Sequence, residues 1–178
     1  MLPTLTVVFC VLLRLLPHPP NFVPMGATGV FAGRTLPLRW ALLLTLGVTA
    51  LVDVLLAQAT GDAAFRAVTP FVYAGFGLQV FLGRLLRARQ GGALAAAALG
   101  ALGFFVISNV GVFLTSGMYS LNVAGLLACF TMALPFFGRS LVADLLWTVA
   151  LALGYRAVSK RVGRTGWAPA SLERLPAI

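Results

Sequence analysis

The chain has 178 residues, of which 60% are hydrophobic and only 10% are charged, and its mean hydropathy is +0.99. This composition excludes an ordinary soluble domain and predicts an integral membrane protein. The formal net charge of +9 does not call for a nucleic-acid partner, because the basic cytoplasmic loops of a membrane protein give the same total.

Residues suited to catalysis or metal binding are few. The chain has four acidic residues and one histidine, and it lacks Walker, HExxH, GxSxG and dinucleotide-binding motifs, so we do not expect an enzyme. Cys10 and Cys129 lie in apolar runs without a CxxC or histidine partner, which predicts inert packing residues rather than a metal site. No cofactor is expected.

Seven apolar segments follow one another along the chain. Four of them reach the length of about 20 residues that a bilayer crossing needs, and they cover residues 36–57, 68–86, 93–114 and 138–158. Three are shorter and cover residues 2–16, 25–33 and 121–137. We expect residues 2–16 to remain as a helix, because they lack the basic region and the small-residue cleavage site of a signal peptide.

Basic residues set the expected orientation through the positive-inside rule. We predict an all-α bundle of about six crossings, at residues 2–16, 17–33, 36–57, 68–86, 93–114 and 138–158, with a re-entrant or short segment at 121–137. Both termini then lie in the cytoplasm of a bacterial cell, and the protein is a multi-pass protein of its cytoplasmic membrane. The cytoplasmic basic residues are Arg34, Arg39, Arg84, Arg87, Arg89, Arg156, Lys160, Arg161, Arg164 and Arg174, and the outer ones are Arg14, Arg66 and Arg139.

This arrangement depends on how the segment at 121–137 is placed. If that segment crossed the membrane on its own, the basic tail would lie outside with five of its charges. We therefore predict one transmembrane domain, residues 1–158, followed by a basic cytoplasmic tail, residues 159–178, whose polar and Gly/Pro-containing sequence predicts mobility.

The stretch RLLPHPPNFVPMGATGVFAG, residues 14–33, interrupts the apolar sequence. Each proline disfavours helix at the residue before it, so the first helix should end near Leu16 and the chain should run extended to Pro24. Residues 25–33 then form a short helix, which makes one broken crossing. Its first amides, at Met25, Gly26 and Ala27, lack an evident cap and favour an anionic or carbonyl oxygen. The alternative is a tight corner at the outer surface.

Polar residues collect toward the outer side of the predicted bundle. Intramembrane ionisable residues usually mark function, so we predict an outward-facing pocket whose candidate ligand contacts are His18, Asn21, Asn109, Tyr119 and Asn122. Asp53 and Asp144 are intramembrane acids that could pair with the outer bases Arg14 and Arg139. These four residues have two open interpretations, ligand contact or structural ion pairs that lock helices together.

Small residues recur at a spacing of four. Gly29 and Gly33, and likewise Ala93, Ala97 and Ala101, lie on single helix faces. Such faces allow neighbouring helix backbones to approach closely, so we expect packed helices there.

The PHPPNFVP block, the later NVGVFLTSGMYSLNVAGLLACFTMALPFFGRSLVADLLW block and Asp53 resemble a bacterial membrane family with a PHPPNFxP motif. Its members are similar to the substrate-binding S subunits of energy-coupling factor (ECF) transporters. That resemblance implies six helices, a small-molecule substrate captured from outside, and a transmembrane coupling subunit with ATPases as partner. The first segment, LTVVFCVLLRLL, lacks the Ala-x-x-x-Ala spacing by which many S subunits dock.

Two functions follow as expectations. The first is a substrate-binding and transport protein, similar to an S subunit, that takes up a small polar or anionic micronutrient. The second is a membrane structural or assembly factor without a ligand, in which the polar residues hold helices together. In both, the lipid bilayer surrounds the protein and no nucleic acid is bound.

Overall fold

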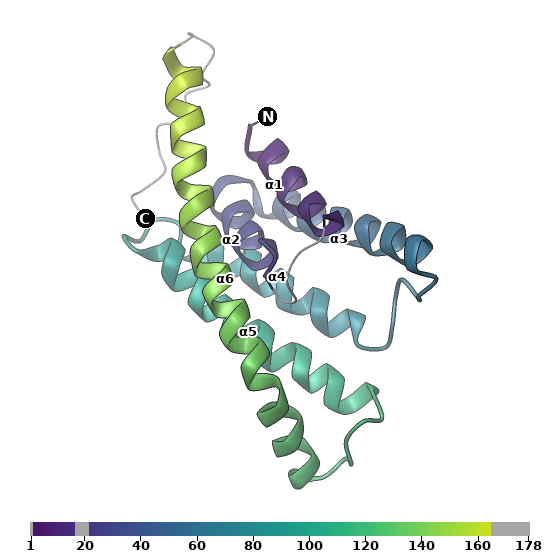
Figure 1. The fold of residues 1–178 in the computed structure, drawn as a ribbon. Helices are drawn as coiled ribbons and strands as arrows, with labels where there is room; N and C mark the ends of the chain where they lie inside the picture. Colours follow the sequence, from purple (N-terminus) through teal and green to yellow (C-terminus); the bar gives the residue numbers. More distant parts are fainter. Residues whose placement is uncertain (1, 17–21, 165–178) are drawn as a thin grey trace.

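The computed structural model describes residues 2–16 and 22–164, with side chains as far as Arg161. The described chain is all helical, which confirms the all-α part of the predicted fold class (Figure 1). It consists of α1 (Leu2–Leu12), a 3-10 turn η1 (Leu13–Leu15), α2 (Met25–Thr35), α3 (Leu38–Thr60), α4 (Thr69–Leu85), α5 (Gly92–Thr115) and α6 (Val123–Arg164).

Three of these helices are long and apolar enough to cross a membrane, namely Leu38–Thr60, Gly92–Thr115 and Val123–Arg161. The other three are shorter: α1 and α2 have 11 residues each and α4 has 17. At about 1.5 Å per residue, α2 is roughly 16 Å long and cannot cross the hydrocarbon core, about 30 Å thick, by itself.

The break after the first helix lies where the prolines place it. Leu16, which precedes Pro17, has an extended backbone with φ −85° and ψ 149°, as expected for a residue before proline. The next helix begins at Met25, after Pro24, so the short helix predicted at 25–33 is confirmed. The predicted extended conformation of residues 17–21, together with His18 and Asn21, lies outside the described residues.

The prediction for residues 121–158 is wrong. We expected a re-entrant segment at 121–137 and a separate crossing at 138–158, but α6 is one continuous helix of 42 residues with Pro135 inside it. In lipid the backbone has few hydrogen-bonding alternatives to the helix, so a proline inside a membrane helix is tolerated. The helix also continues through residues 159–164, which we had assigned to the tail.

The centre of the bundle is α2. All nine residues from Met25 to Gly33 are buried, and α2 contacts α1, α3, α4, α5 and α6 (Figure 1). Gly33 and Gly83 explain the closest of these contacts, since a Cβ atom at Gly33 would meet the Val80 carbonyl and one at Gly83 would meet the Val30 carbonyl. The small-residue face predicted at Gly29 and Gly33 therefore lies against α4.

Two apolar clusters show how the helices are aligned along the length of the bundle. Near the start of α2, Met25 packs with Val11, Val52 and Phe76. Near its end, Phe31 packs with core residues that include Val7, Val80 and Tyr155. Consequently α1 and α2 run antiparallel, and the first residue of α2 lies deep in the bundle. The predicted small face of α5 is also buried, with Ala93, Ala97 and Ala101 each at most 4% exposed.

Candidate functional site

The buried acid Asp144 meets the first turn of α2 inside the bundle. It is 6% exposed and lies close to the middle of α6. Its carboxylate accepts hydrogen bonds from the backbone amides of Gly26 and Ala27. An acidic group at a helix N-terminus satisfies amides that the helix itself cannot and is favoured by the helix dipole. The amides that the sequence predicted to need an oxygen thus find it within the same chain.

Gly26 makes this contact possible. A Cβ atom added at Gly26 would overlap both carboxylate oxygens of Asp144. Pro24 stands just before the first turn and provides no side-chain hydrogen bond to its amides. The sequence therefore supplies a helix start without a local cap and a glycine that leaves room for a distant carboxylate.

Gln79 completes the cluster from α4. Its side chain is 2% exposed, and its Nε2 donates a hydrogen bond of 3.2 Å to Asp144 Oδ2. Its Oε1 is buried and has no hydrogen-bond partner in the described part of the chain. Gly29 and Gly100 lie against the Gln79 side chain, where a Cβ atom would come within 3.2 Å of Gln79 Cβ and 2.8 Å of Gln79 Cγ, respectively. We call Asp144, Gln79, Gly26 and Ala27 the central cluster.

A further buried hydroxyl lies one helical turn beyond Asp144. Thr148 is 4% exposed, and its Oγ1 has no hydrogen-bond partner among the described residues. Buried polar atoms normally find a partner, and in lipid an unmet one is more costly. The middle of the bundle therefore holds two buried polar atoms, Thr148 Oγ1 and Gln79 Oε1, that have no hydrogen-bond partner among the described residues. Of these, Gln79 Oε1 can only accept a hydrogen bond.

A second polar cluster joins the end of α1 to α3 and α4. Arg14 Nη1 lies 2.8 Å from Asp53 Oδ1, and the Tyr73 hydroxyl donates a 2.7 Å hydrogen bond to Asp53 Oδ2. Both carboxylate oxygens are thus engaged, and the charge of Asp53 is balanced by that of Arg14. We call these three residues the Arg14 cluster. An ion pair between an intramembrane acid and an outer base was one of the two open interpretations, and Arg14 and Asp53 form such a pair.

Arg139 and Asp144 do not form the second of the two ion pairs that were considered for these four residues. Arg139 is exposed and forms no ion pair within the described residues, whereas Asp144 is buried against α2. The two residues lie five positions apart on one helix, where side chains do not share a face. The interpretation that both acids would pair with the outer bases therefore holds for Asp53 alone.

The other predicted ligand contacts serve local structure or lie elsewhere. The Asn109 side chain donates a 2.7 Å hydrogen bond to the Phe105 carbonyl of its own helix. Asn122 Oδ1 accepts a 2.9 Å hydrogen bond from the Gly125 amide, which makes it the N-cap of α6. Tyr119 is partly buried in the connection between α5 and α6. The structure does not bring Asn109, Tyr119 and Asn122 together with Asp144.

Gln79 is the residue that our reading of the sequence missed. It stands alone as a polar side chain in the apolar run VYAGFGLQVFLG of α4. A carboxamide at such a position is expensive in a membrane segment and is a signal of a partner or a function. The small residues Gly75 and Gly83 on either side of it gave a second signal, since close helix packing was to be expected there.

Comparison with known proteins places the chain in one family. Residues 1–170 match the family described as a family of unknown function, DUF6580, and the chain therefore belongs to it. No curated protein matches the chain, and no solved structure matches it.

Proposed function

We propose that the protein is a membrane-embedded substrate-binding and transport protein, similar to ECF S subunits, that takes up a small polar micronutrient. In this proposal the chain crosses the membrane six times, first at residues 2–16 and at residues 17–33, which include most of α2, and then at α3, α4, α5 and α6. Both termini lie in the cytoplasm, and the pocket opens outward. A transmembrane coupling subunit with ATPases is the partner that the resemblance implies.

One observation carries the proposal: the central cluster holds a buried carboxamide oxygen that receives no hydrogen bond from the described residues, next to a buried carboxylate, at the start of a short internal helix. Broken helices that begin near the middle of the membrane form the substrate sites of several transporter folds. If the cluster served only to hold helices together, we would expect its polar atoms to be paired with each other. Gln79 Oε1 is instead open to a ligand N–H or O–H group.

The same geometry narrows the ligand class. The amides of Gly26 and Ala27 are already bound by Asp144, so an anion at that helix end would have to displace a carboxylate. Gln79 Oε1 and the Asp144 oxygens accept hydrogen bonds. They favour a neutral or cationic ligand with N–H or O–H donors over the anionic ligands that we had also expected. The predicted contacts His18 and Asn21 precede α2 and remain candidates within this proposal.

Native mass spectrometry of the protein purified from cells tests the proposal. We expect the wild type to carry a small molecule that is lost in Gln79→Met, a change that keeps the side-chain volume and removes the carboxamide. Asn109→Leu is the matched control, because it removes a carboxamide that is bonded within its own helix. A wild type that carries no molecule, and that no member of a broad metabolite panel stabilises against thermal unfolding, would contradict the proposal.

The Arg14 cluster favours a second function, a membrane structural or assembly factor without a ligand. All its polar groups that face Asp53 are paired, as in a helix lock. This alternative predicts that changes in either cluster alter thermal stability or the recovery of partner proteins in pull-downs, and that no variant reveals dependence on a small molecule.

A further inference from the structure

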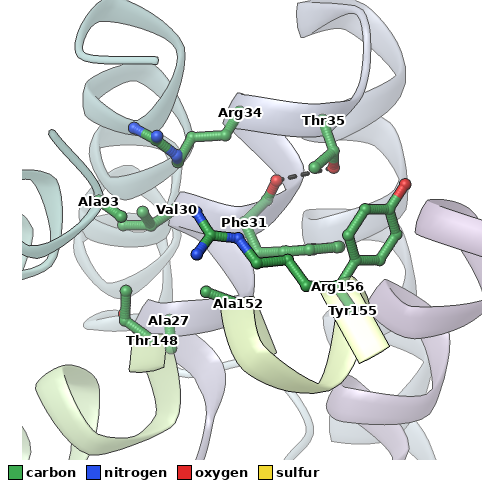
Figure 2. A pocket seen from close by; sticks show the side chains of 10 residues that line it. All are labelled: Ala27, Val30, Phe31, Arg34, Thr35, Ala93, Thr148, Ala152, Tyr155 and Arg156. Carbon is green, nitrogen blue, oxygen red and sulfur yellow. Dashed lines mark hydrogen bonds between the residues drawn. The ribbon is translucent and has the colours of Figure 1, made fainter. Parts of the chain in front are cut away.

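A small cationic cavity lies between α2, α5 and α6, and its lining includes Ala27 of the central cluster. Its volume is about 40 Å³, and its lining includes Arg34 and Arg156 together with Thr35, Thr148 and Tyr155. The ten described residues of this lining carry two guanidinium groups, three hydroxyl groups and no carboxylate. Figure 2 shows both guanidinium groups turned toward the side of the cavity where Ala93 lies.

Arg34 is held in place by the backbone. Its Nη1 donates a 3.0 Å hydrogen bond to the Leu86 carbonyl, and Gly92 allows this close approach, since a Cβ atom there would overlap the same carbonyl. A guanidinium group has further N–H donors after one is used. Arg34 lies just beyond the proposed crossing at 17–33, and burial, together with the charge of Arg156, lowers the pKa of its guanidinium. Two cations that face one cavity favour an anion between them.

The volume limits what can enter. A buried water needs about 10–15 Å³ of such space, so a cavity of about 40 Å³ holds a group of phosphate size. Sites that enclose a whole small-molecule ligand are far larger, on the order of 300–1,000 Å³. The occupant therefore places one anionic group in the cavity and keeps the rest of its mass elsewhere.

An apolar groove adjoins this cavity. It lies between α1 and α6, has a volume of about 340 Å³, and is lined mainly by apolar side chains such as Leu5, Phe9 and Leu151. Tyr155 belongs to the lining of both hollows, and in Figure 2 its hydroxyl points away from the guanidinium groups. An anionic group beside an apolar groove of this kind matches the chemistry of a phospholipid.

We propose that Arg34 and Arg156 bind the phosphate of an anionic phospholipid, one acyl chain of which lies in the groove between α1 and α6. Basic pockets between membrane helices on the cytoplasmic side are the places where anionic headgroups bind. In the proposed topology Arg34 and Arg156 lie on that side. This proposal rests on the proposed topology but not on the transported ligand, because the cavity is lined by neither Asp144 nor Gln79.

The test uses the full chain, delipidated in detergent and titrated with phosphatidylglycerol or with phosphatidylcholine of the same acyl chains, with bound lipid counted by native mass spectrometry. We expect phosphatidylglycerol to bind more tightly. Arg34→Gln and Arg156→Gln should each weaken it about fivefold, as for the loss of one basic side chain facing an anionic lipid. Arg39→Gln is the matched control, since Arg39 is exposed and lies over Trp40.

A second pair of variants separates a lipid from a free anion. Gly154 lines the groove, and a Cβ atom there meets nothing within 4 Å, so we expect Gly154→Leu to place its side chain in the groove. Gly138 is equally open on α6 and does not line the groove, which makes Gly138→Leu its control. We expect Gly154→Leu alone to weaken phosphatidylglycerol, while an inorganic phosphate titration shows no specific binding.

Several results would overturn the proposal. Equal binding of the two lipids by the wild type, or unchanged phosphatidylglycerol binding in both arginine variants, would do so. Inorganic phosphate binding that depends on Arg34 and Arg156, with no effect of Gly154→Leu on lipid binding, would assign the cavity to a free anion and end the lipid assignment. If Arg34→Gln does not fold, Arg156→Gln and Arg34→Lys decide the matter by the same titration.

Discussion

The two acids within the bundle, the partly buried Asp53 and the buried Asp144, are held in contrasting ways. Asp53 has a cation and a hydroxyl on its two oxygens, so its charge is balanced and its cluster is complete. Asp144 has only backbone amides and a carboxamide as partners in the described chain, and the carboxamide keeps an unmet acceptor. The first arrangement resembles an ion pair that holds helices together, whereas the second has an unpaired hydrogen-bond acceptor, as a binding site would.

The largest expected loss of stability comes from a substitution that separates Asp144 from the first turn of α2. Gly26→Ala places a methyl group on the Asp144 carboxylate, within a helix that is buried on all sides. Overpacking of this kind costs about 1–3 kcal/mol, and displacing the carboxylate also leaves buried amides unpaired. We expect a loss of about 3 kcal/mol, measured by chemical or thermal unfolding in detergent. Gly138→Ala, at an open helical position, should leave stability unchanged or slightly raised, and an equal loss there would refute this explanation.

The next largest loss of stability is expected when the ion pair between Arg14 and Asp53 is broken. Removing one partner of a buried ion pair costs about 3–5 kcal/mol, but Arg14 and Asp53 are 24% and 16% exposed, so screening reduces the expected loss to about 2 kcal/mol for Arg14→Met. In a double-mutant cycle with Asp53→Leu, the second change should cost less than it does alone. Strict additivity of the two losses would show that the pair does not act as a unit.

Neutralising Asp144 should destabilise the protein only moderately but should abolish ligand binding. Asp144→Asn keeps the shape and one acceptor oxygen, and it removes the favourable charge at the N-terminus of α2, which is worth up to about 2 kcal/mol in partly buried sites. We expect about 1–2 kcal/mol of destabilisation together with loss of any copurifying molecule. Retention of the molecule at wild-type occupancy would remove Asp144 from the binding site.

The smallest expected effect is at a local cap. Asn122→Ala removes the N-cap of α6, which should cost about 1 kcal/mol without changing ligand content. Thermal unfolding and native mass spectrometry of the same sample check both parts. Loss of the ligand in a folded Asn122→Ala protein would restore Asn122 as a contact.

The sequence predicted much of the fold because proline and hydrophobicity act locally. The prolines before Met25 fixed the start of α2, and the apolar runs predicted α3, α4 and α5 to within a few residues of their observed ends. The division of residues 121–158 was wrong, because the distribution of basic residues does not show whether the chain continues as one helix, and α6 runs through Pro135 without a break. Local sequence signals therefore located the start of α2 and the ends of α3, α4 and α5 well, but not the extent of α6.

The site was predicted only in part, because its partners come from distant segments. The need of α2 for an oxygen acceptor at its first turn followed from the lack of a capping side chain. That Asp144 supplies it depends on how α6 packs across α2, which no spacing in the sequence reveals. An ion pair among Arg14, Asp53, Arg139 and Asp144 was among the interpretations because the chain has only four acidic residues, but which residues pair was not predicted.

The most direct test of the contrast between the two clusters is an experimental structure of the protein purified from cells, at a resolution that reveals bound ligands and ordered water around Gln79. We predict density for a ligand within hydrogen-bonding distance of Gln79 Oε1 and close to the Asp144 carboxylate, with the Arg14 cluster unchanged. A structure in which Gln79 Oε1 accepts a hydrogen bond from another protein group, with no density beside it, would contradict the assignment of the central cluster as a binding site.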